Sequence, residues 1–247
     1  MLTEPTLEKL TSLRLDAMAA AWLAQQKDTE ARHLDFDERF GLLVDAECLH
    51  RENRRLDRLL REAKLKLGQA CVEDIDYPAA RRLDRSLIRQ LATGRWIREH
   101  HNVVVTGATG TGKTYLACAL AQHACRQGFR TLYRRASRLF EEMGLARADG
   151  SYVRVLGKFA RIDVMIIDDW GLTPVREPER ADLLEVLEDR YGARSTIMTS
   201  QLDPKRWHDH LGDPTLADAI CDRVLHNAHR IALFGPSRRK SETKTQD

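Results

Sequence analysis

The most informative stretch of the chain is Asn102-Val-Val-Val-Thr-Gly107-Ala-Thr-Gly-Thr-Gly112-Lys113-Thr114, which joins an apolar run to a glycine-rich turn. It matches the pattern G-x4-G-K-[S/T] and precedes an alanine-rich segment, so the turn is expected to connect a strand to a helix. Glycines let successive backbone N–H groups curl around a phosphate, and the helix N-terminus adds partial positive charge. Lys113 would reach the β- and γ-phosphates, and Thr114 would place its hydroxyl on Mg²⁺. We predict a site for ATP and Mg²⁺ at Gly107, Ala108, Thr109, Gly110, Thr111, Gly112, Lys113, Thr114 and Tyr115.

Strands and helices are expected to alternate around this turn. The sequence predicts strands at 102–106, 130–133, 163–168, 195–200 and 230–233, and helices at 84–92, 113–127, 137–148, 153–160, 178–191, 204–210 and 215–226. Strands separated mostly by single helices imply a parallel sheet. Apolar runs such as Val164-Met-Ile-Ile167 fit a sheet that is buried on both faces. The predicted fold is an α/β P-loop NTPase with its parallel sheet between helices.

The first 67 residues have a different pattern. They are rich in Leu, Ala and charged residues, with no proline after Pro5 and one glycine, Gly41. This composition predicts two long helices, at about 6–26 and 35–66. Turn-forming residues then cluster between Gly68 and Pro78 and indicate a linker. We predict a helical domain at 1–67, a linker at 68–82 and an ATPase domain at 83–247.

A pair of carboxylates follows the apolar run Val164-Met-Ile-Ile167. In a parallel sheet the carboxyl end of a strand opens onto the ligand crevice, which would bring Asp168 beside the magnesium at the glycine-rich turn. We expect Asp168 to be the Walker B metal partner and Asp169 to polarise the attacking water. Glu is the more usual residue at that second position, and the alternative role for Asp169 is to cap the end of the strand.

The strand Ser195-Thr-Ile-Met-Thr-Ser200 also ends in polar groups. If it lies beside the strand that ends at Asp168, these groups would come near the γ-phosphate, at the sensor position of AAA+ ATPases. Thr199 and Ser200 both fit this role, and the sequence does not choose between them.

Composition excludes few classes of function. Lys and Arg number 40 against 37 Asp and Glu, so the net charge of +3 does not by itself indicate a nucleic-acid partner. Apolar runs are far shorter than the roughly 20 residues of a membrane span, and the N-terminus has no signal-like core. We expect a cytoplasmic protein without membrane contact. Its five scattered cysteines suit reduced thiols better than disulfides.

Several further motifs carry a resemblance to a known family. They are Phe36-Asp-Glu-Arg-Phe40, Asp45-Ala-Glu-Cys-Leu-His-Arg-Glu-Asn-Arg-Arg55, Arg89-Gln-Leu-Ala-Thr-Gly-Arg95, Asp168-Asp-Trp-Gly171, Thr199-Ser-Gln-Leu202, Gly212-Asp-Pro-Thr-Leu-Ala-Asp-Ala-Ile220 and Asp222-Arg-Val-Leu-His-Asn227. In this order and spacing, over nearly the whole chain, they resemble the IstB-type helper ATPases of insertion-sequence transposition. That family is similar to DnaC-type helicase loaders within the AAA+ class.

The resemblance implies an ATPase that oligomerises with ATP on duplex DNA and presents the target DNA to a DDE-type transposase. By analogy with this class, Arg223 falls at the arginine-finger position, where it would contact ATP bound by a neighbouring subunit. Its alternative role is a surface ion pair. A DnaC-like helicase loader is the alternative function, and a small-molecule P-loop kinase is disfavoured because no acceptor-binding segment is visible.

Two groups of arginines are expected to contact DNA phosphates without reading the bases. In the first, Arg51, Arg54, Arg58 and Arg61 recur every three or four residues, which places them on one helix face. A solvated charged face would look the same. In the second, arginines follow a strand where a helix begins. The predicted DNA-binding residues are Arg51, Arg54, Arg55, Arg58, Arg61, Arg134, Arg135 and Arg138.

The C-terminal residues carry two smaller expectations. The segment after Leu233 is too short for the helical lid of many AAA+ proteins, so we expect no C-terminal lid domain. Ser237-Arg-Arg239 resembles a Ser-x-Arg feature that could contact phosphate or DNA. Subunit number, ring or helical assembly, target-site preference and the transposase contact surface do not follow from the sequence.

Overall fold

The computed structural model describes residues 3–238, and the chain divides into two compact units after Arg58. The smaller unit is helical, and the larger one contains the sheet. The sequence predicted the boundary after residue 67. The structure divides the chain earlier because the last turns of the long helix pack with the larger unit, where Leu59 and Ala63 are buried.

The smaller unit contains α1 (Thr3–Ser12), α2 (Asp16–Lys27), the short 3-10 helix η1 (Glu30–His33) and most of α3 (Phe36–Ala63). The single helix predicted at 6–26 is wrong. The chain turns at Arg14, whose φ is +58°, and the Leu15 N–H donates to the Leu10 carbonyl at 2.9 Å. This is the hydrogen bond of a Schellman-type helix end. The sequence has neither Gly nor Pro at this break. An arginine instead adopts the left-handed conformation that glycine usually takes.

Helix α3 begins where the sequence predicted it. Asp35 accepts a hydrogen bond from the Glu38 N–H at 2.8 Å, and Glu38 accepts one from the Asp35 N–H at 3.2 Å. This reciprocal pair is a capping box that satisfies two backbone donors at the helix start. The helix ends at Ala63, three residues before the predicted end, because Lys64 has a φ of +51°.

The larger unit alternates helices and strands as predicted. Its elements after α3 are η2 (Ala79–Arg81), α4 (Arg85–Ala92), α5 (Arg95–Arg98), β1 (Asn102–Gly107), α6 (Lys113–Arg126), β2 (Thr131–Arg135), α7 (Ala136–Ala148), α8 (Tyr152–Ala160), β3 (Val164–Trp170), α9 (Glu177–Glu188), β4 (Ser195–Ser200), η3 (Pro204–Arg206), α10 (Trp207–Leu211), α11 (Pro214–Leu225) and β5 (Ala228–Leu233). The short helix α5, which the sequence did not predict, carries the buried Trp96 and Ile97.

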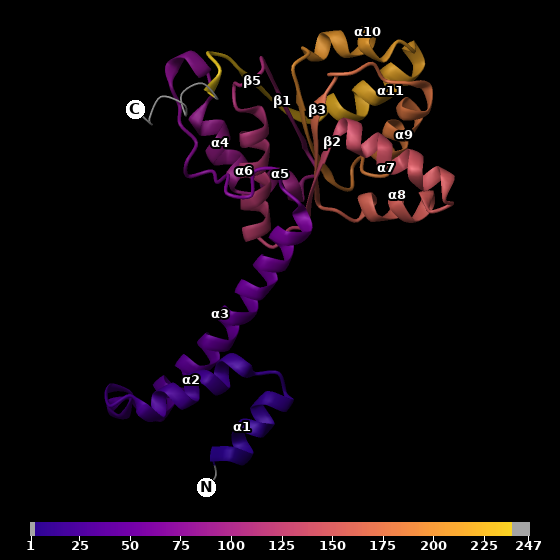
Figure 1. The fold of residues 1–247 in the computed structure, drawn as a ribbon. Helices are drawn as coiled ribbons and strands as arrows, with labels where there is room; N and C mark the ends of the chain where they lie inside the picture. The colour runs from indigo at the N-terminus through magenta and orange to yellow at the C-terminus, as the bar shows by residue number, and fades with distance from the viewer. Residues whose placement is uncertain (1–2, 239–247) are drawn as a thin grey trace, which may run out of the picture. The chain divides into compact units, whose positions relative to one another are not determined.

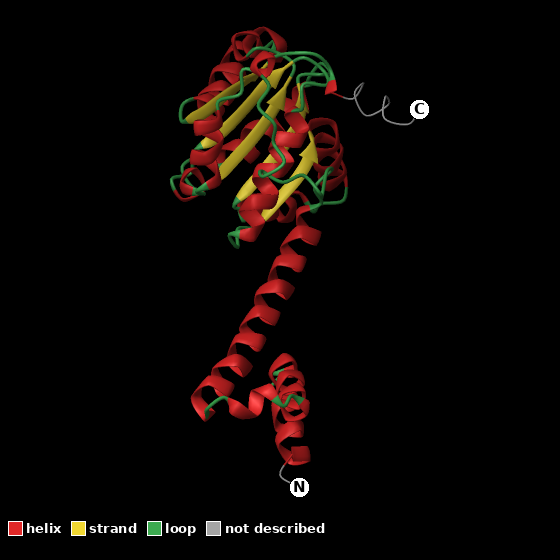
Figure 2. Ribbon diagram, turned by 90° about the vertical axis from the view of Figure 1, so that its left-hand side faces the viewer, coloured by secondary structure: helices red, strands yellow, loops and turns green. Residues whose placement is uncertain are grey.

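The strands form a parallel sheet in the order β2-β3-β4-β1-β5, and they lie side by side in Figure 2. Figure 1 shows α4, α5 and α6 on one side of this sheet and α7 to α11 on the other. The predicted class, a parallel sheet between helices, is therefore confirmed. Strand β4 lies between β1 and β3, which brings the polar end of β4 beside both predicted functional strands.

Successive residues of the central strands pack alternately into two separate hydrophobic cores. Val103 and Val105 face the core with α6, whereas Val104 faces the core with α7 and α9. Ile166 and Met165 divide in the same way on β3. Both faces of the sheet are therefore dry, which explains why these strands are continuously apolar.

The segment 68–82, predicted to be a linker, packs as part of the larger unit. Ala70 and Ile75 are 2% and 5% exposed and belong to the core on the α6 side. Their polar neighbours Asp74 and Asp76 face a pocket. The linker prediction failed because apolar residues anchor this segment at intervals that match neither a helix nor a strand.

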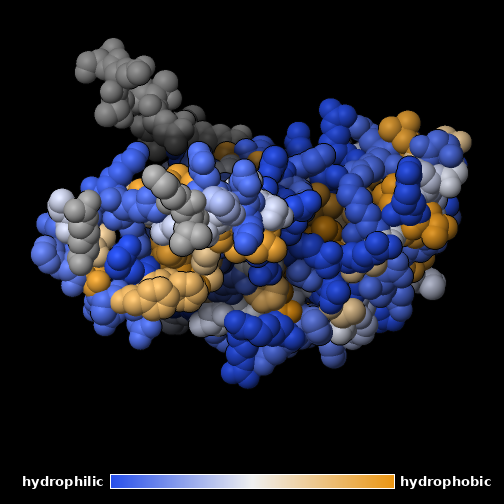
Figure 3. All heavy atoms as spheres, turned by 90° about the horizontal axis from the view of Figure 1, so that it is seen from below, coloured by the Kyte–Doolittle hydropathy of each residue, from blue (hydrophilic) through white to orange (hydrophobic). Residues whose placement is uncertain are grey.

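The surface is mainly polar. In the view of Figure 3, hydrophilic residues cover most of the visible surface and hydrophobic ones lie in separate patches. In the smaller unit, Phe36 and Phe40 are 77% and 51% exposed and stack on each other with ring centroids 6.0 Å apart. Among the described residues, no helix is both long and apolar enough to cross a bilayer.

Candidate nucleotide-binding site

The turn between β1 and α6 has the backbone conformation that its glycines predict. Gly107, Gly110 and Gly112 have φ values of +148°, +86° and +91°. A Cβ on Gly107 would lie 2.3 Å from the Leu233 carbonyl oxygen, so this position also has no room for a side chain. The Thr111 hydroxyl donates to the Ala108 carbonyl at 2.9 Å and closes the turn.

Lys113 is the first residue of α6 and is 6% exposed. Its ammonium donates to the carbonyls of Gly107 at 2.9 Å and Ala108 at 3.0 Å, so it lies over the turn. A phosphate in the turn would exchange these carbonyl contacts for stronger, charge-assisted ones.

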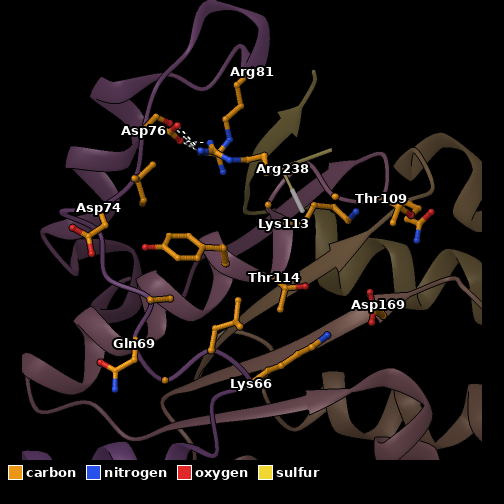
Figure 4. Close-up of a pocket in the computed structure, with 18 residues that line it drawn as sticks. Lys66, Gln69, Asp74, Asp76, Arg81, Thr109, Lys113, Thr114, Asp169 and Arg238 are labelled. Carbon is orange, nitrogen blue, oxygen red and sulfur yellow. Dashed lines mark hydrogen bonds and ion pairs between the residues drawn. The ribbon is translucent and has the colours of Figure 1, made fainter. Parts of the chain in front are cut away.

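A pocket of about 850 Å³ opens at this turn (Figure 4). One wall is the turn and the start of α6, and the opposite wall is the segment that follows α3. Of the nine residues predicted to bind nucleotide, those that line the pocket are Thr109, Gly110, Gly112, Lys113, Thr114 and Tyr115. The pocket is large enough for a nucleoside triphosphate.

Asp168 is fully buried and lies against Thr114. The Thr114 hydroxyl is 3.0 Å from Oδ1 and 3.1 Å from Oδ2 of this carboxylate. The two residues predicted to hold Mg²⁺ are therefore adjacent, although they are 54 positions apart in the chain.

Tyr133 is a site residue that the sequence analysis missed. Its hydroxyl donates to Asp168 Oδ2 at 2.7 Å, and burial together with this hydrogen bond raises the pKa of Tyr133 far above its ordinary value. The phenol therefore stays protonated and acts as a fixed donor to the carboxylate. One feature of the sequence could have identified Tyr133 as a site residue. It lies one residue before Arg134, at the end of an apolar strand.

A bulge in β3 sets the direction of the two aspartates. The register passes from Ile167 opposite Met198 to Trp170 opposite Ser200, so β3 has one residue more than β4 over this stretch. Asp169 lies in the bulge with a φ of +60°, a conformation that Asp tolerates better than most residues. The bulge lets Asp169 line the pocket while Asp168 contacts Thr114.

The carboxylate of Asp169 forms an ion pair with Arg135. The two guanidinium nitrogens Nε and Nη2 lie 3.1 and 2.9 Å from Oδ2, and the Asp169 side chain is 20% exposed. An arginine predicted to contact DNA is thus tied to the carboxylate predicted to polarise water.

The structure separates the two residues that could act as the sensor. The Thr199 hydroxyl donates to Asp168 Oδ1 at 2.5 Å and accepts the Asp169 N–H at 3.1 Å. The Ser200 hydroxyl instead donates to the Trp170 carbonyl and accepts the Leu202 N–H. Thr199 is therefore the residue in contact with both aspartates.

The residues present fit a magnesium-bound triphosphate. A hard cation takes oxygen ligands, and Mg²⁺ usually binds through one or two protein groups plus phosphates and water. The Thr114 hydroxyl and the Asp168 carboxylate supply two such oxygens beside the phosphate-binding turn. Within residues 3–238, no cluster of three or more His, Cys, Asp or Glu offers a separate metal cage.

Two guanidinium groups flank the far side of the turn. Arg81 is 4% exposed, and burial followed by the nearby Arg238 charge lowers the pKa of Arg81. Both arginines pair with Asp76, and the Arg238 N–H donates to the Gly110 carbonyl at 3.0 Å (Figure 4). Ser237 also lies against Gly110, whereas Arg239, the last residue of the predicted Ser-x-Arg feature, lies outside the described residues.

Arg223 lies far from the pocket of its own chain. The Asn102 side-chain amide donates to the Arg223 carbonyl, so Arg223 is next to the start of β1, whereas the glycine-rich turn follows its end. Five residue steps of a strand separate the two by about 16 Å. The Arg223 guanidinium pairs with Glu188 and Asp222, each at 2.7 Å, and lies over the Tyr191 ring.

The arginines predicted to contact DNA differ in their availability. Arg51 pairs with Glu47 at 2.8 Å and also donates to the Arg14 carbonyl. The Arg134 side chain is 12% exposed and pairs with Glu142, so little of its surface remains for a phosphate. Arg138 is 73% exposed beside Glu141. Arg135 pairs with Asp169. The remaining four, Arg54, Arg55, Arg58 and Arg61, are exposed on α3.

Comparisons with known proteins agree with this geometry. Residues 8–246 match the family described as IstB-like ATP binding protein. Relatives include the insertion sequence ATP-binding protein y4pL of Sinorhizobium fredii, 48% identical over 99% of both chains. The corresponding protein of IS1162 from Pseudomonas fluorescens is 53% identical over 82% of this chain and 87% of its own.

Solved structures share the fold at low sequence identity. AMPPCP-bound DnaA from Aquifex aeolicus has a TM-score of 0.58 at 16% identity and covers 72% of this chain and 56% of its own. DnaI has a TM-score of 0.58 at 21% identity and covers 72% of this chain and 93% of its own. The chain has the AAA+ P-loop fold with a phosphate-binding turn. The chain belongs to the family of IstB-like ATP binding proteins of insertion sequences.

Proposed function

We propose that this chain is an ATPase that assembles on duplex DNA with ATP and serves the transposase of its insertion sequence. The observation that carries the enzymatic part is the contact between Thr114 and Asp168, with Asp169 beside them at the pocket. A phosphate-binding turn alone would only hold a nucleotide. A carboxylate at the metal position and a second carboxylate facing the pocket supply the groups that hydrolysis needs.

In the proposed reaction, a water oxygen attacks the γ-phosphorus, the bond from that phosphorus to the β–γ bridging oxygen breaks, and ADP and phosphate leave. Lys113 and the backbone N–H groups of the turn hold the β- and γ-phosphates. Asp169 orients the water and accepts its proton. Thr114 and Asp168 would hold Mg²⁺, which would supply positive charge to the phosphate oxygens. Thr199 joins Asp168 and Asp169 and acts as the sensor that keeps both aspartates in register.

The position of Arg223 supports the assembly part of the proposal. Because it lies about 16 Å from the turn of its own chain, it can act only on nucleotide held by a neighbouring copy. To do so it must leave Glu188, whose pKa is lowered mainly by its hydrogen bond with Arg223. ATP at such an interface would favour the oligomer, since a ligand stabilises the state that binds it.

The DNA-binding part rests on family membership and on exposed arginines. We propose Arg54, Arg55, Arg58, Arg61 and Arg138 as phosphate contacts, because they are exposed on helices. Arg135 links the two functions, since a DNA phosphate that attracts Arg135 would release Asp169. The sequence-independent mode follows from phosphate contacts alone.

The test is sedimentation and phosphate release by the full-length chain with and without ATP, and with and without duplex DNA. We expect the largest assembly and the fastest hydrolysis when both are present. Addition of the transposase encoded by the same insertion sequence should yield a ternary complex with DNA. A chain that stays monomeric in all four conditions would contradict the assembly proposal, and binding to a replicative helicase instead would favour the loader function.

A further inference from the structure

A second lysine enters the nucleotide pocket from the segment after α3. The Lys66 ammonium is 3.9 Å from Asp168 Oδ2, and the Lys66 side chain is 39% exposed while that of Asp168 is fully buried. In Figure 4 the Lys66 side chain extends below Thr114 toward the side of Asp169. Lys66 belongs to the basic run after Arg51, but no pattern in the sequence places it in this site.

The surroundings of Asp168 explain why this contact matters. Its hydrogen-bond partners Thr114, Tyr133 and Thr199 are all neutral hydroxyls. Among the described residues, the ion pair of Asp168 is with Lys66. A buried carboxylate without a cation is strongly disfavoured, so the site needs either a metal ion or this ammonium group.

The backbone holds Lys66 in place from both sides. Before it, Leu59 and Ala63 are buried, and Leu65 packs on the core of the larger unit. After it, Ala70 is 2% exposed in the same core. The left-handed Lys64 ends the helix and redirects the chain into the pocket. Lys66 is therefore delivered to Asp168 by a fixed turn and does not reach it from a long free segment.

We propose that Lys66 is the built-in counter-ion of the metal site. It neutralises Asp168 while no nucleotide is bound, and it releases the carboxylate when Mg²⁺·ATP enters. The inference rests on the proposed role of Asp168 as a metal ligand. Two cations cannot share Oδ2 without repulsion, so Lys66 and Mg²⁺ compete, and the Mg²⁺ concentration that supports nucleotide binding is set partly by this lysine.

The experiment titrates AMPPCP, a nonhydrolysable ATP analogue, into the full-length chain over a series of Mg²⁺ concentrations and in EDTA. For Lys66→Met we expect the half-saturating Mg²⁺ concentration to fall by about tenfold, because the competing cation is gone. Lys66→Arg keeps the charge and should behave as wild type. So should Lys205→Met, which removes an exposed lysine that does not line the pocket.

Two further measurements separate the outcomes. In an Asp168→Asn background, Lys66→Met should have no effect on the Mg²⁺ requirement, because the shared carboxylate is absent. Without nucleotide, Lys66→Met should lower the melting temperature, and saturating Mg²⁺·AMPPCP should close that gap. Lys66→Gln gives the same comparison if the Met variant is insoluble.

An unchanged Mg²⁺ requirement in Lys66→Met would overturn the inference. So would an equal loss of AMPPCP affinity with Mg²⁺ and in EDTA, since it would make Lys66 a phosphate ligand. If the wild-type chain itself does not bind AMPPCP with Mg²⁺, the proposed function fails and this inference fails with it. Wild-type binding with no Lys66 effect refutes only the counter-ion.

Discussion

One buried side chain, Asp168, connects several elements of the larger unit. Its two oxygens contact hydroxyls from α6, β2 and β4, so a single carboxylate joins three elements of the larger unit at the pocket. Asp169 is one residue further but has a different environment, being partly exposed and paired with Arg135. The two adjacent aspartates therefore have different surroundings, which suit the two different roles proposed for them.

The first prediction concerns Asp169. Asp169→Asn removes the proton acceptor but leaves the turn and Asp168 intact, so AMPPCP binding and assembly on DNA should be retained. Phosphate release should fall by about 10²-fold or more, the usual contribution of a general base. Asp189→Asn, at an exposed aspartate, is the matched control for the same assays. Unchanged turnover in Asp169→Asn would remove Asp169 from the mechanism.

A second prediction concerns Arg190, which is 1% exposed. Its guanidinium donates to the carbonyls of Phe159, Ile162 and Ser195 and to the Thr196 hydroxyl. Arg190→Met leaves these acceptors buried without donors and should lower the free energy of unfolding by about 3 kcal/mol, measured by urea denaturation. Arg194→Met, at a half-exposed neighbour, should cost less than about 1 kcal/mol. An equal loss of unfolding free energy in the two variants would mean that the buried hydrogen bonds of Arg190 contribute no more to stability than the contacts of Arg194.

At the scale of elements, α3 combines two kinds of residue. One kind holds the smaller unit together: buried Glu47 accepts the N–H groups of Ala17 and Met18 at the start of α2, each at 3.1 Å, and pairs with Arg51. The other kind is exposed and basic. Arg51 was predicted to contact DNA, yet its contacts suit a structural role. Arg54 and Arg58 are exposed, so a phosphate can reach them.

The third prediction tests that exposed face. Arg54→Ala with Arg58→Ala should weaken duplex DNA binding and reduce the slope of log K against log salt by about 2, because each phosphate contact releases about one counterion. Arg154→Ala with Arg161→Ala removes the same charge from the α8 region and should leave the slope unchanged. An unaltered slope in the α3 variant would indicate that this helix face is only solvated and does not contact DNA.

A fourth prediction concerns pH. The hydrogen bond from Arg51, with further bonds from the N–H groups of Met18 and Ala17, lowers the pKa of Glu47 below its ordinary value. A carboxyl whose pKa is lower in the folded state stabilises the fold above its unfolded pKa, and this contribution is lost as pH falls through the folded value. Hydrogen-exchange protection of α2, corrected for intrinsic rates, should thus be lower in Glu47→Gln than in wild type at pH 7. The difference should narrow below pH about 4.5.

The control is Glu52→Gln, which removes an exposed carboxyl of the same helix. It should leave the protection of α2 unchanged at every pH. A difference between Glu47→Gln and wild type that is constant from pH 7 to pH 3 would show that the charge of Glu47 does not stabilise α2.

At the scale of the whole molecule, the larger unit has a complete phosphate-binding end and an arginine at the opposite end of the sheet. Arg223 beside the start of β1 and Lys113 beyond its end are therefore suited to different partners. An active site built from two copies would require both, one from each chain.

The fifth prediction uses complementation between two inactive variants. Arg223→Ala keeps an intact phosphate-binding turn, and Lys113→Ala keeps an intact Arg223, so each should hydrolyse little ATP alone. Mixed in equal amounts with duplex DNA, they should recover a measurable fraction of wild-type turnover, because some interfaces pair the two intact halves. A mixture as inactive as its parts, with assembly retained in sedimentation, would place Arg223 outside the mechanism.

Most of the fold and part of the site could be predicted from the sequence. The five strands, their parallel direction and the proximity of Thr114 and Asp168 followed from local patterns, because the glycine-rich turn and the apolar strands are continuous in the chain. The helix break at Arg14 and the packing of residues 68–82 did not follow, because neither carries the usual glycine, proline or periodicity. The choice of Thr199 over Ser200 needed the direction of each side chain.

The sequence by itself determined that a strand, a phosphate-binding turn and a helix follow one another, because glycine conformation and apolar periodicity act over a few residues. Only the tertiary structure decided which further side chains join Thr114 at Asp168. Tyr133 and Lys66 come from segments with no shared motif, and the β3 bulge that directs Asp169 depends on pairing with β4. Contacts between distant segments are set by packing and by the need to pair a buried charge, which no short stretch of sequence records.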